Sequence, residues 1–195
     1  MKKAFTLSEV LITLTIIGVV AALTIPSLNN HVGEADKIAK IKKVQAILGD
    51  MLVLSEIANG PMENWPVNEN VGNMKTKFWP KYIKPFFNST KLCNNMTDCG
   101  YGPNFKASKW QDANWGLSTG STRVLFQLMD GTVIFWPLNT TDAQGRPAYV
   151  NKIYVDINGP KNPNTFCKDV FTFAKDYDQG TISATGCTLE YITEK

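Results

Sequence analysis

The first 26 residues constrain this chain more than any other part of its sequence. Lys2 and Lys3 precede an apolar run over residues 5–25, and the only charged residue inside that run is Glu9. As an α-helix, these 21 residues would extend over about 31 Å, close to the ~30 Å hydrocarbon core of a bilayer. The run therefore predicts a helix that crosses a membrane, with the two lysines on the cytoplasmic side.

A secretory signal peptide is the simplest interpretation of this segment. Lys2 and Lys3 would form its basic region, and a signal peptidase would cleave near Ala21 and Ala22. This interpretation leaves Glu9 unexplained, because an unpaired carboxylate is costly in hydrocarbon and a signal peptide gains nothing from it.

The segment also contains an ordered set of residues around Glu9. They are Ala4-Phe5-Thr6-Leu7-Ser8-Glu9-Val10-Leu11, followed by Ile16-Ile17-Gly18, Ala21-Ala22 and Pro26. This set resembles the class III leader of type IV pilins and type II secretion pseudopilins. The resemblance implies that a prepilin peptidase cleaves between Ala4 and Phe5 and methylates the new amino terminus. Glu9 then matches the family's acidic fifth mature residue, and Gly18 and Pro26 match its helix-weakening positions.

Two residues depart from the family pattern. Ala4 stands where the family usually has glycine, and Ser8 stands where an aliphatic residue is common. Alanine has the next smallest side chain, so cleavage after Ala4 is still expected. Neither departure changes the charge pattern.

The position of Glu9 indicates how copies of the chain could assemble. Cleavage would create an ammonium at Phe5, one turn from the Glu9 carboxylate and at the positive end of the helix dipole. In a medium of low dielectric constant, the terminal ammonium of an incoming copy can neutralise that carboxylate. We therefore expect Glu9 to set the axial register of a filament whose core is made of apolar helices.

The resemblance also implies a location and a set of partners. It implies a single-pass bacterial inner-membrane protein with its head outside the cytoplasm, which then enters a periplasmic or cell-surface filament. The implied partners are copies of itself, other pilin-like subunits, a prepilin peptidase, and an inner-membrane assembly platform with its ATPase. The sequence leaves open whether the filament is a secretion pseudopilus or a type IV pilus. The alternative function is a monomeric membrane-anchored module that binds a ligand such as carbohydrate through Trp65, Trp110 or Trp115.

The residues after Pro26 predict an α+β head. Apolar residues at three- and four-residue steps predict an amphipathic helix to about Ala58, and Asn59-Gly60-Pro61 should stop it. The apolar positions of this stripe are Ile38, Ile41, Val44, Leu48, Met51 and Leu52. The predicted divisions are a leader at 1–4, an assembly helix at 5–26, and a head at 27–195 that includes the second half of the long helix.

The rest of the head is predicted as a small antiparallel sheet packed on that helix. Residues 61–75 read as a loop, and the aromatic residues between 78 and 87 read as core rather than as a sugar site. Residues 124–129 and 132–136 predict a hairpin, because Asp130-Gly131 suits a two-residue turn. A third strand is expected over 149–157.

The composition disfavours catalysis and nucleic-acid binding. The chain has 20 basic and 17 acidic residues, and loss of Lys2 and Lys3 would bring these numbers closer still. Nucleic-acid-binding domains instead carry a clustered basic surface. His31 is the only histidine, which leaves little material for a catalytic triad or a multi-histidine metal site. We therefore expect a protein that is not an enzyme.

All four cysteines lie after the apolar run. Outside the cytoplasm they would be oxidised. Of the three pairings that four cysteines allow, we favour the two that close local loops. These are Cys93 with Cys99 and Cys167 with Cys187. A zinc site fits less well, because the spacings differ from those of zinc fingers.

The segment after residue 155 resembles the C-terminal loop of pilins and pseudopilins. Major pseudopilins hold calcium in a loop of the head, and Asp156, Asn158 and Asp169 could offer oxygen ligands. The pattern is incomplete as a calcium loop, and Asp and Asn followed by Gly form turns in their own right. We therefore favour a structural role for these residues and expect no cofactor.

Overall fold

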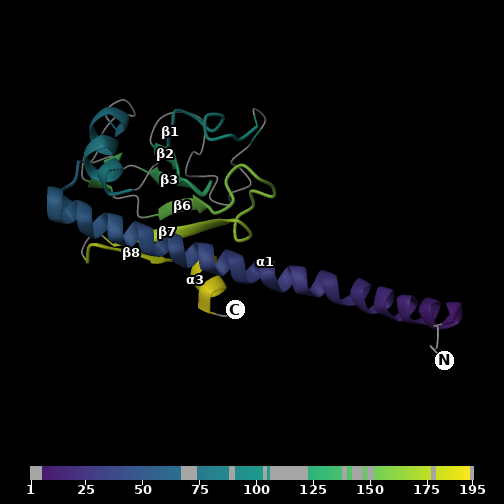
Figure 1. Cartoon of the computed structure of the whole chain (residues 1–195). Coiled ribbons are helices and arrows are strands. Elements are labelled where there is room, and N and C mark those ends of the chain that lie inside the picture. Colours follow the sequence, from purple (N-terminus) through teal and green to yellow (C-terminus); the bar gives the residue numbers. More distant parts are fainter. Residues whose placement is uncertain are drawn as a thin grey trace. The chain divides into compact units, whose positions relative to one another are not determined.

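The architecture is α+β, as the sequence predicts (Figure 1). The computed structural model describes residues 6–66, 74–87, 91–102, 105, 123–137, 140–141, 147–148, 152–176 and 179–193; for 23–32, 123, 140–141 and 147–148 it describes the backbone alone. The helices are α1 (Leu7–Asn59), η1 (Met62–Asn64), η2 (Met74–Ile83), η3 (Lys84–Phe86) and α3 (Cys187–Thr193). The strands are β1 (Lys91–Cys93), β2 (Arg123–Gln127), β3 (Val133–Pro137), β4 (Thr140–Thr141), β5 (Pro147–Ala148), β6 (Lys152–Asp156), β7 (Val170–Asp176) and β8 (Thr181–Ala184).

The chain divides into two compact units, and the boundary falls inside α1. One unit is Met1–Ala39, and the other, which we call the head, is Lys40–Lys195. The predicted division at residue 26 marks the end of a membrane segment rather than of a compact unit, so it stays a prediction. The described part of the first unit is helical from Leu7 onward.

The helix α1 ends where the sequence predicts. Its last residue is Asn59, and Gly60 takes a φ of +85°. The amide of Gly60 donates to the carbonyl of Glu56 at 2.8 Å. This left-handed residue caps the free carbonyls at the helix end, which glycine does without a Cβ penalty.

The part of α1 in the head supplies one side of the main core. Its apolar stripe is almost completely buried, at 0–1% exposure. The buried residues of this stripe are Ile41, Val44, Leu48, Met51 and Leu52. They pack in one cluster with strand residues such as Phe126, Ile134 and Phe173. Within the head, this part of α1 therefore packs against the sheet.

The sheet has six antiparallel strands, twice the number that the sequence predicts. Their order is β1-β2-β3-β6-β7-β8, which Figure 1 shows along the head, and β4 and β5 form a separate two-stranded ribbon. Neighbours in the sheet are neighbours in the chain, apart from the ribbon inserted between β3 and β6. The register pairs Phe135 with Tyr154, and Tyr154 with Thr172.

Both faces of this sheet are buried. Along β3, Ile134 and Trp136 belong to the cluster that includes α1, whereas Val133 and Phe135 belong to a second cluster. Such alternation follows from the two-residue period of a strand. The second cluster contains Cys93, Cys99, Tyr101, Tyr154 and Val170. The disulfide-closed segment after β1 therefore covers the face opposite α1.

The aromatic segment at residues 78–87 forms core, as predicted. Phe78, Trp79, Tyr82 and Phe87 are buried. Pro80 lies inside the π-helix η2 rather than breaking it. The expected loop at 61–75 contains the 3-10 helix η1, and its residues 67–73 lie outside the described residues.

The hairpin of β2 and β3 forms where predicted, but its turn is longer than two residues. Val133 pairs with Gln127, and the amide of Leu128 donates to the carbonyl of Thr132 at 2.9 Å, which leaves three residues in the loop. Gly131 takes a φ of +89°. The Asp130 carboxylate accepts the Thr132 amide at 3.1 Å. Asp130 thus acts through its side chain, and glycine alone supplies the positive φ that a three-residue loop needs.

The third predicted strand ends one residue earlier than expected, and other elements were missed. The strand β6 covers Lys152–Asp156, whereas residues 149–151 lie outside the described residues. Residues 169–171 read as a loop, yet β7 begins at Val170 and its first four residues are all buried. A strand buried on both faces lacks the alternation that identifies a half-exposed strand. The short elements β1, β8 and α3 gave no clear pattern.

No helix among the described residues is long and apolar enough to cross a membrane.

Candidate functional site

The amino-terminal turn of α1 is closed by a reciprocal cap between Thr6 and Glu9. The Thr6 amide and hydroxyl each donate to the Glu9 carboxylate at 2.8 Å, and the Glu9 amide donates to the Thr6 hydroxyl at 3.3 Å. This arrangement is a capping box, in which Ser or Thr at the cap pairs with Glu or Gln three residues later. The Thr-x-x-Glu spacing is visible in the sequence, although the role predicted there for Glu9 is in assembly alone.

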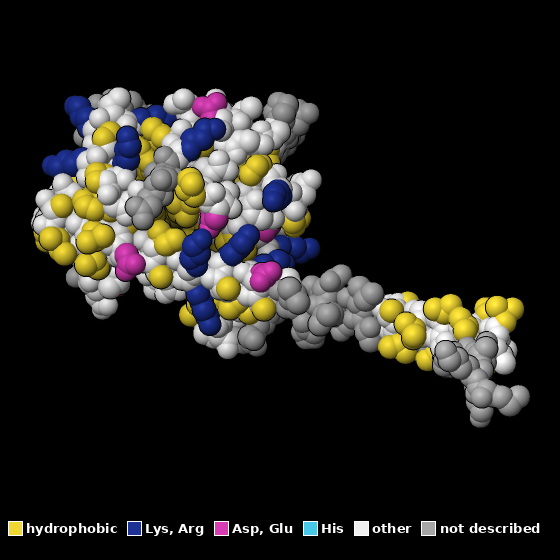
Figure 2. All heavy atoms as spheres, in the orientation of Figure 1, with side chains coloured by type: hydrophobic (Ala, Val, Ile, Leu, Met, Phe, Trp, Pro, Cys, Tyr) yellow, Lys and Arg dark blue, Asp and Glu magenta, His cyan; other side chains and the backbone are white. Residues whose placement is uncertain are grey.

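The apolar side chains that follow the cap are exposed. From Leu7 to Val20 the large apolar residues are 43–79% exposed, with Leu7 at 79% and Val10 at 43%. Figure 2 shows hydrophobic side chains gathered along this part of the helix. Soluble proteins rarely expose a continuous apolar surface, and such surfaces indicate contact with another protein or with a membrane.

Two threonines within this apolar stretch are bonded to the helix itself. The Thr13 hydroxyl donates to the Glu9 carbonyl at 3.0 Å, and the Thr15 hydroxyl donates to the Leu11 carbonyl at 2.8 Å. Together with the capping box, these bonds give three polar side chains of the stretch a partner within one turn. An apolar surrounding would therefore leave the hydrogen-bonding groups of these side chains satisfied, whereas the negative charge of Glu9 would remain costly there.

The remaining residues of the leader pattern are only partly described. Ala4 and Phe5 lie outside the described residues, and so does the expected cleavage site. The helix α1 continues through Gly18 and Pro26 without interruption. A Cβ added at Gly18 would meet no atom within 4 Å, so packing within this chain does not require glycine there. The helix-weakening role of both residues stays a prediction.

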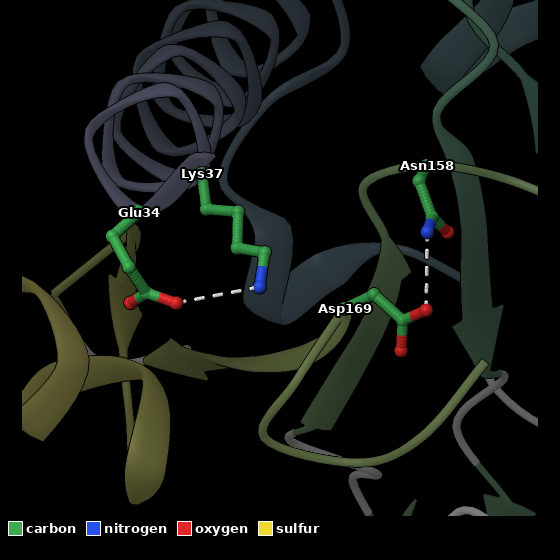
Figure 3. A network of polar contacts seen from close by, with 4 residues as sticks. All are labelled: Glu34, Lys37, Asn158 and Asp169. Carbon is green, nitrogen blue, oxygen red and sulfur yellow. Dashed lines mark hydrogen bonds and ion pairs between the residues drawn. The ribbon is translucent and has the colours of Figure 1, made fainter. Parts of the chain in front are cut away.

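Further along the same unit, Lys37 and Glu34 form an ion pair at 3.5 Å, drawn in Figure 3. Their side chains are 38% and 39% exposed. Exposed pairs of this kind contribute little to stability. We assign the pair no functional role.

The four cysteines form the two predicted pairs. The Cα atoms of Cys93 and Cys99 are 5.5 Å apart, and those of Cys167 and Cys187 are 5.8 Å apart. The first disulfide closes the segment that follows β1. The second joins the turn before β7 to the first residue of α3.

The residues considered as calcium ligands lie together at the end of β6. The Asp169 carboxylate accepts the Asn158 side-chain amide at 3.1 Å, as drawn in Figure 3, and the Asn164 backbone amide at 2.7 Å. Asp156 is completely buried, and its carboxylate accepts the Tyr101 hydroxyl at 2.7 Å and the Asn158 backbone amide at 3.2 Å. Sequence reasoning missed Tyr101, which gives no local signal because it is 55 residues away.

Burial sets the charge state of this cluster. Burial raises the pKa of Asp156 to about 7, and the negative charge of Asp169 adds to the rise, while the hydrogen bond from Tyr101 opposes it. Burial, together with the Asp156 charge, raises the pKa of Tyr101 as well. Both carboxylates already accept hydrogen bonds from protein donors, which favours the structural interpretation. Among the described residues, no three His, Cys, Asp or Glu side chains are grouped closely enough to hold a metal ion.

A second buried charge lies near the other end of the sheet. Lys175 is 2% exposed, its ammonium donates to the Pro137 carbonyl at 3.3 Å, and it lies 5.2 Å from the centre of the Trp136 ring. Burial lowers the pKa of Lys175 to about 7. The sequence gave no reason to single it out, since a lysine near the end of a strand is ordinarily exposed.

Of the three tryptophans named for the alternative ligand platform, the structure describes only Trp65, and its burial does not support that function. Trp65 is only 4% exposed, and its indole donates to the Gly60 carbonyl at 2.9 Å. It packs against Tyr82 with ring centres 5.0 Å apart. The expectation that Trp65 is an exposed platform is therefore wrong, and Trp110 and Trp115 lie outside the described residues.

Comparison with known proteins identifies the amino-terminal segment. The family described as the prokaryotic N-terminal methylation motif matches residues 1–25. The chain thus carries a class III prepilin leader, of the kind typical of type IV pilins and pseudopilins. No match was found among curated proteins or among solved structures. The motif implies processing by a prepilin peptidase and points to a structural protein rather than an enzyme.

Proposed function

We propose that this chain, which begins with a prepilin leader, is a structural subunit of a pilin-type filament. The cleaved and N-methylated protein would wait in the bacterial inner membrane and then polymerise through its apolar helix. Its disulfide-linked head would lie outside the cytoplasm, on a periplasmic or cell-surface filament. The long helix and the antiparallel sheet agree with this pilin-like role.

One observation carries the proposal: the apolar surface of α1 between Leu7 and Val20 is exposed, and it lies within the segment that matches the methylation motif. Water is an unfavourable surrounding for a surface of this kind, at roughly 25 cal/mol per Å² of apolar area. A bilayer before assembly and neighbouring helices after assembly would each cover it. The internal bonding of Thr13 and Thr15 suits both surroundings.

In this proposal Glu9 has a second role besides capping its own helix. Cleavage after Ala4 leaves Thr6 in place, so the capping box survives processing. The carboxylate has two oxygens with lone pairs to spare, and it can still accept an ammonium from another copy. An apolar surrounding strengthens that attraction, because the effective dielectric constant is low. The charge of Glu9, rather than its capping bonds, would then drive assembly.

The proposed partners follow from the same reasoning. A prepilin peptidase would cleave and methylate the chain, and an inner-membrane platform with its ATPase would extract it from the bilayer. Copies of this chain, with or without other pilin-like subunits, would form the filament. In this proposal the head provides a surface for contacts and has no catalytic role.

The test separates the charge of Glu9 from its cap. Glu9→Gln removes the charge but keeps a residue that completes a capping box. Thr6→Ala keeps the charge but removes the hydroxyl that exchanges two of the three bonds with Glu9. We expect Glu9→Gln and Glu9→Leu to abolish filaments in electron micrographs of cells that carry the assembly machinery, and Thr6→Ala to retain them.

Mass spectrometry of the same preparations provides the control for processing. Wild type and every variant should begin at Phe5, and the wild-type terminus should carry an N-methyl group. Filaments of normal length from Glu9→Gln would contradict the charge role. A native chain that begins near residue 22 would contradict the whole proposal.

A further inference from the structure

A second apolar surface lies on the outer side of α1, within the head. In the last two turns of the helix, Val53, Leu54 and Ile57 are 53%, 50% and 78% exposed. One to three turns earlier on the same side, the exposed residues are charged or small. These earlier residues are Lys42, Lys43, Ala46 and Asp50. We call these seven residues the outer face of α1.

The character of the outer face therefore changes along the helix, from basic at its start to apolar at its end. The amino-terminal stretch changes in a complementary way, with the acidic Glu9 at its start and the exposed apolar residues Val19 and Val20 further on. The distance between charge and apolar pair is also the same. Eleven residues separate Glu9 from Val20, and eleven separate Lys43 from Leu54.

When two such helices run parallel with an offset of 34 residues, the two surfaces match along their length. Ser8 and Glu9 lie beside Lys42 and Lys43, Ile12 lies beside Ala46, and Val19 and Val20 lie beside Val53 and Leu54. All these positions recur at three- and four-residue steps, so each set occupies one side of its helix. The offset corresponds to an axial shift of about 51 Å.

Other registers match less well. A shift of one residue places Lys43 beside Val10 and Ala46 beside Thr13. A shift of one turn places Glu9 beside Lys40, but then Lys43 and Asp50 lie beside Ile12 and Val19. In the 34-residue register the one mismatch is Ile16 beside Asp50. Asp50 lines a groove of about 370 Å³ together with Lys43, Asp130 and apolar residues such as Leu54 and Phe86.

We propose that the outer face of α1 in one copy is the docking surface for residues 8–20 of a second copy, offset by 34 residues. This inference rests on the proposed function and adds the register and the contact residues. The occupant is a second copy because the acid and the apolar pair on one surface complement the base and the apolar pair on the other. Lys43 is 55% exposed even while it pairs with Asp130 at 2.7 Å, so it remains accessible to Glu9 of a neighbour.

The register is tested by cysteine cross-linking in filaments of the full-length chain. The variant Ile12→Cys with Ala46→Cys places one thiol on each surface at matched positions. A disulfide needs Cβ atoms within about 4.5 Å of each other, so cross-linking reports the register closely. The matched control is Ile12→Cys with Val53→Cys, in which the second thiol lies about 10 Å further along the helix. All four native cysteines are already paired.

We expect oxidised filaments of the first variant to give a ladder of covalent multimers without reductant, and those of the control variant to give monomer. Equal cross-linking of both variants, or filaments of the first variant that do not cross-link, would overturn the register while leaving the filament proposal intact. Wild-type cells that form no filament would instead overturn the proposed function, and this inference with it.

A charge variant tests the contact without new cysteines. Lys43→Gln removes the cation that the docking surface offers to Glu9 in addition to the terminal ammonium, whereas Asp130→Asn breaks the same intrachain ion pair but keeps the Lys43 charge. We expect Lys43→Gln to lower filament yield about tenfold, and Asp130→Asn to leave it unchanged, at equal head stability. An equal loss in both variants would assign the effect to the intrachain pair and contradict the docking surface.

Discussion

The two ends of α1 are similarly apolar but have opposite surroundings. Between Leu7 and Val20, the large apolar side chains are 43–79% exposed, whereas Ile41, Leu48 and Met51 are completely buried. The sheet provides a partner for the second set, whereas the described residues of the first unit form one helix. An apolar side chain is therefore expected to be buried against other apolar groups. Whether those groups come from the same chain is decided by the tertiary structure.

The polar groups of the two regions differ in the same way. In the amino-terminal stretch, Thr13, Thr15 and Glu9 are bonded within one turn of helix. In the head, Asp156 is bonded to Tyr101 across 55 residues. A segment that must enter more than one surrounding benefits from local bonds, because these do not depend on any tertiary contact.

The largest expected effect comes from truncating one apolar residue in each half of the helix. Leu48→Ala should destabilise the head by roughly 2–5 kcal/mol, because it opens a cavity in a packed core. Ile12→Ala should change head stability by less than about 0.5 kcal/mol, since Ile12 is exposed. Thermal unfolding of the detergent-solubilised chain, followed by tryptophan fluorescence, measures both. Equal destabilisation by the two variants would contradict the separation of the regions.

The next largest effect is expected from removing a disulfide of the head. The disulfide between Cys167 and Cys187 closes a loop with a sequence separation of 20. Replacing both cysteines by alanine should cost roughly 3 kcal/mol, mainly through the greater entropy of the unfolded head. Filament formation should persist at temperatures where the variant head stays folded. Urea unfolding measures the loss, and an unchanged midpoint would show that the link adds nothing to the head.

The smallest expected effect is a pH dependence confined to the head. The pKa of Asp156 is raised from 3.8 to about 7, so the folded head binds this proton more tightly than the unfolded chain does. The stability from protonation is therefore fully present below about pH 4 and is lost as the pH rises through about 7. The Tm of the head should fall between pH 5 and pH 7, because above pH 7 the lowered pKa of Lys175 adds a trend of the opposite sign.

Matched variants assign that pH dependence. Asp156→Asn should flatten the change in Tm, because the amide does not titrate and its oxygen can still accept from Tyr101. Asp36→Asn, which alters an exposed carboxylate in the other unit, should leave the dependence as it is. A Tm that falls equally in both variants would assign the effect to other groups.

Local sequence patterns predicted the elements whose signals are complete within a few residues. The end of α1 at Asn59-Gly60, the β2–β3 hairpin and the buried stripe from Ile41 to Leu52 were all found in this way. The same approach failed for β7, because burial on both faces removes the alternation of a strand. It also failed for the turn at Asp130, because the choice between two and three loop residues depends on strand register.

The features of the candidate site also divide into those that local sequence predicts and those that depend on tertiary contacts. The methylation motif, the capping residues Thr6 and Glu9, and the pairing of the cysteines depend on order and spacing, which the sequence contains. The burial of Trp65 and Lys175, and the contact of Tyr101 with Asp156, depend on residues that approach from distant strands and loops. The sequence by itself therefore determined that the chain carries a prepilin leader and which stretch of α1 is apolar. Only the tertiary structure decided which side chains the head could cover, because burial depends on the surfaces that folding brings together.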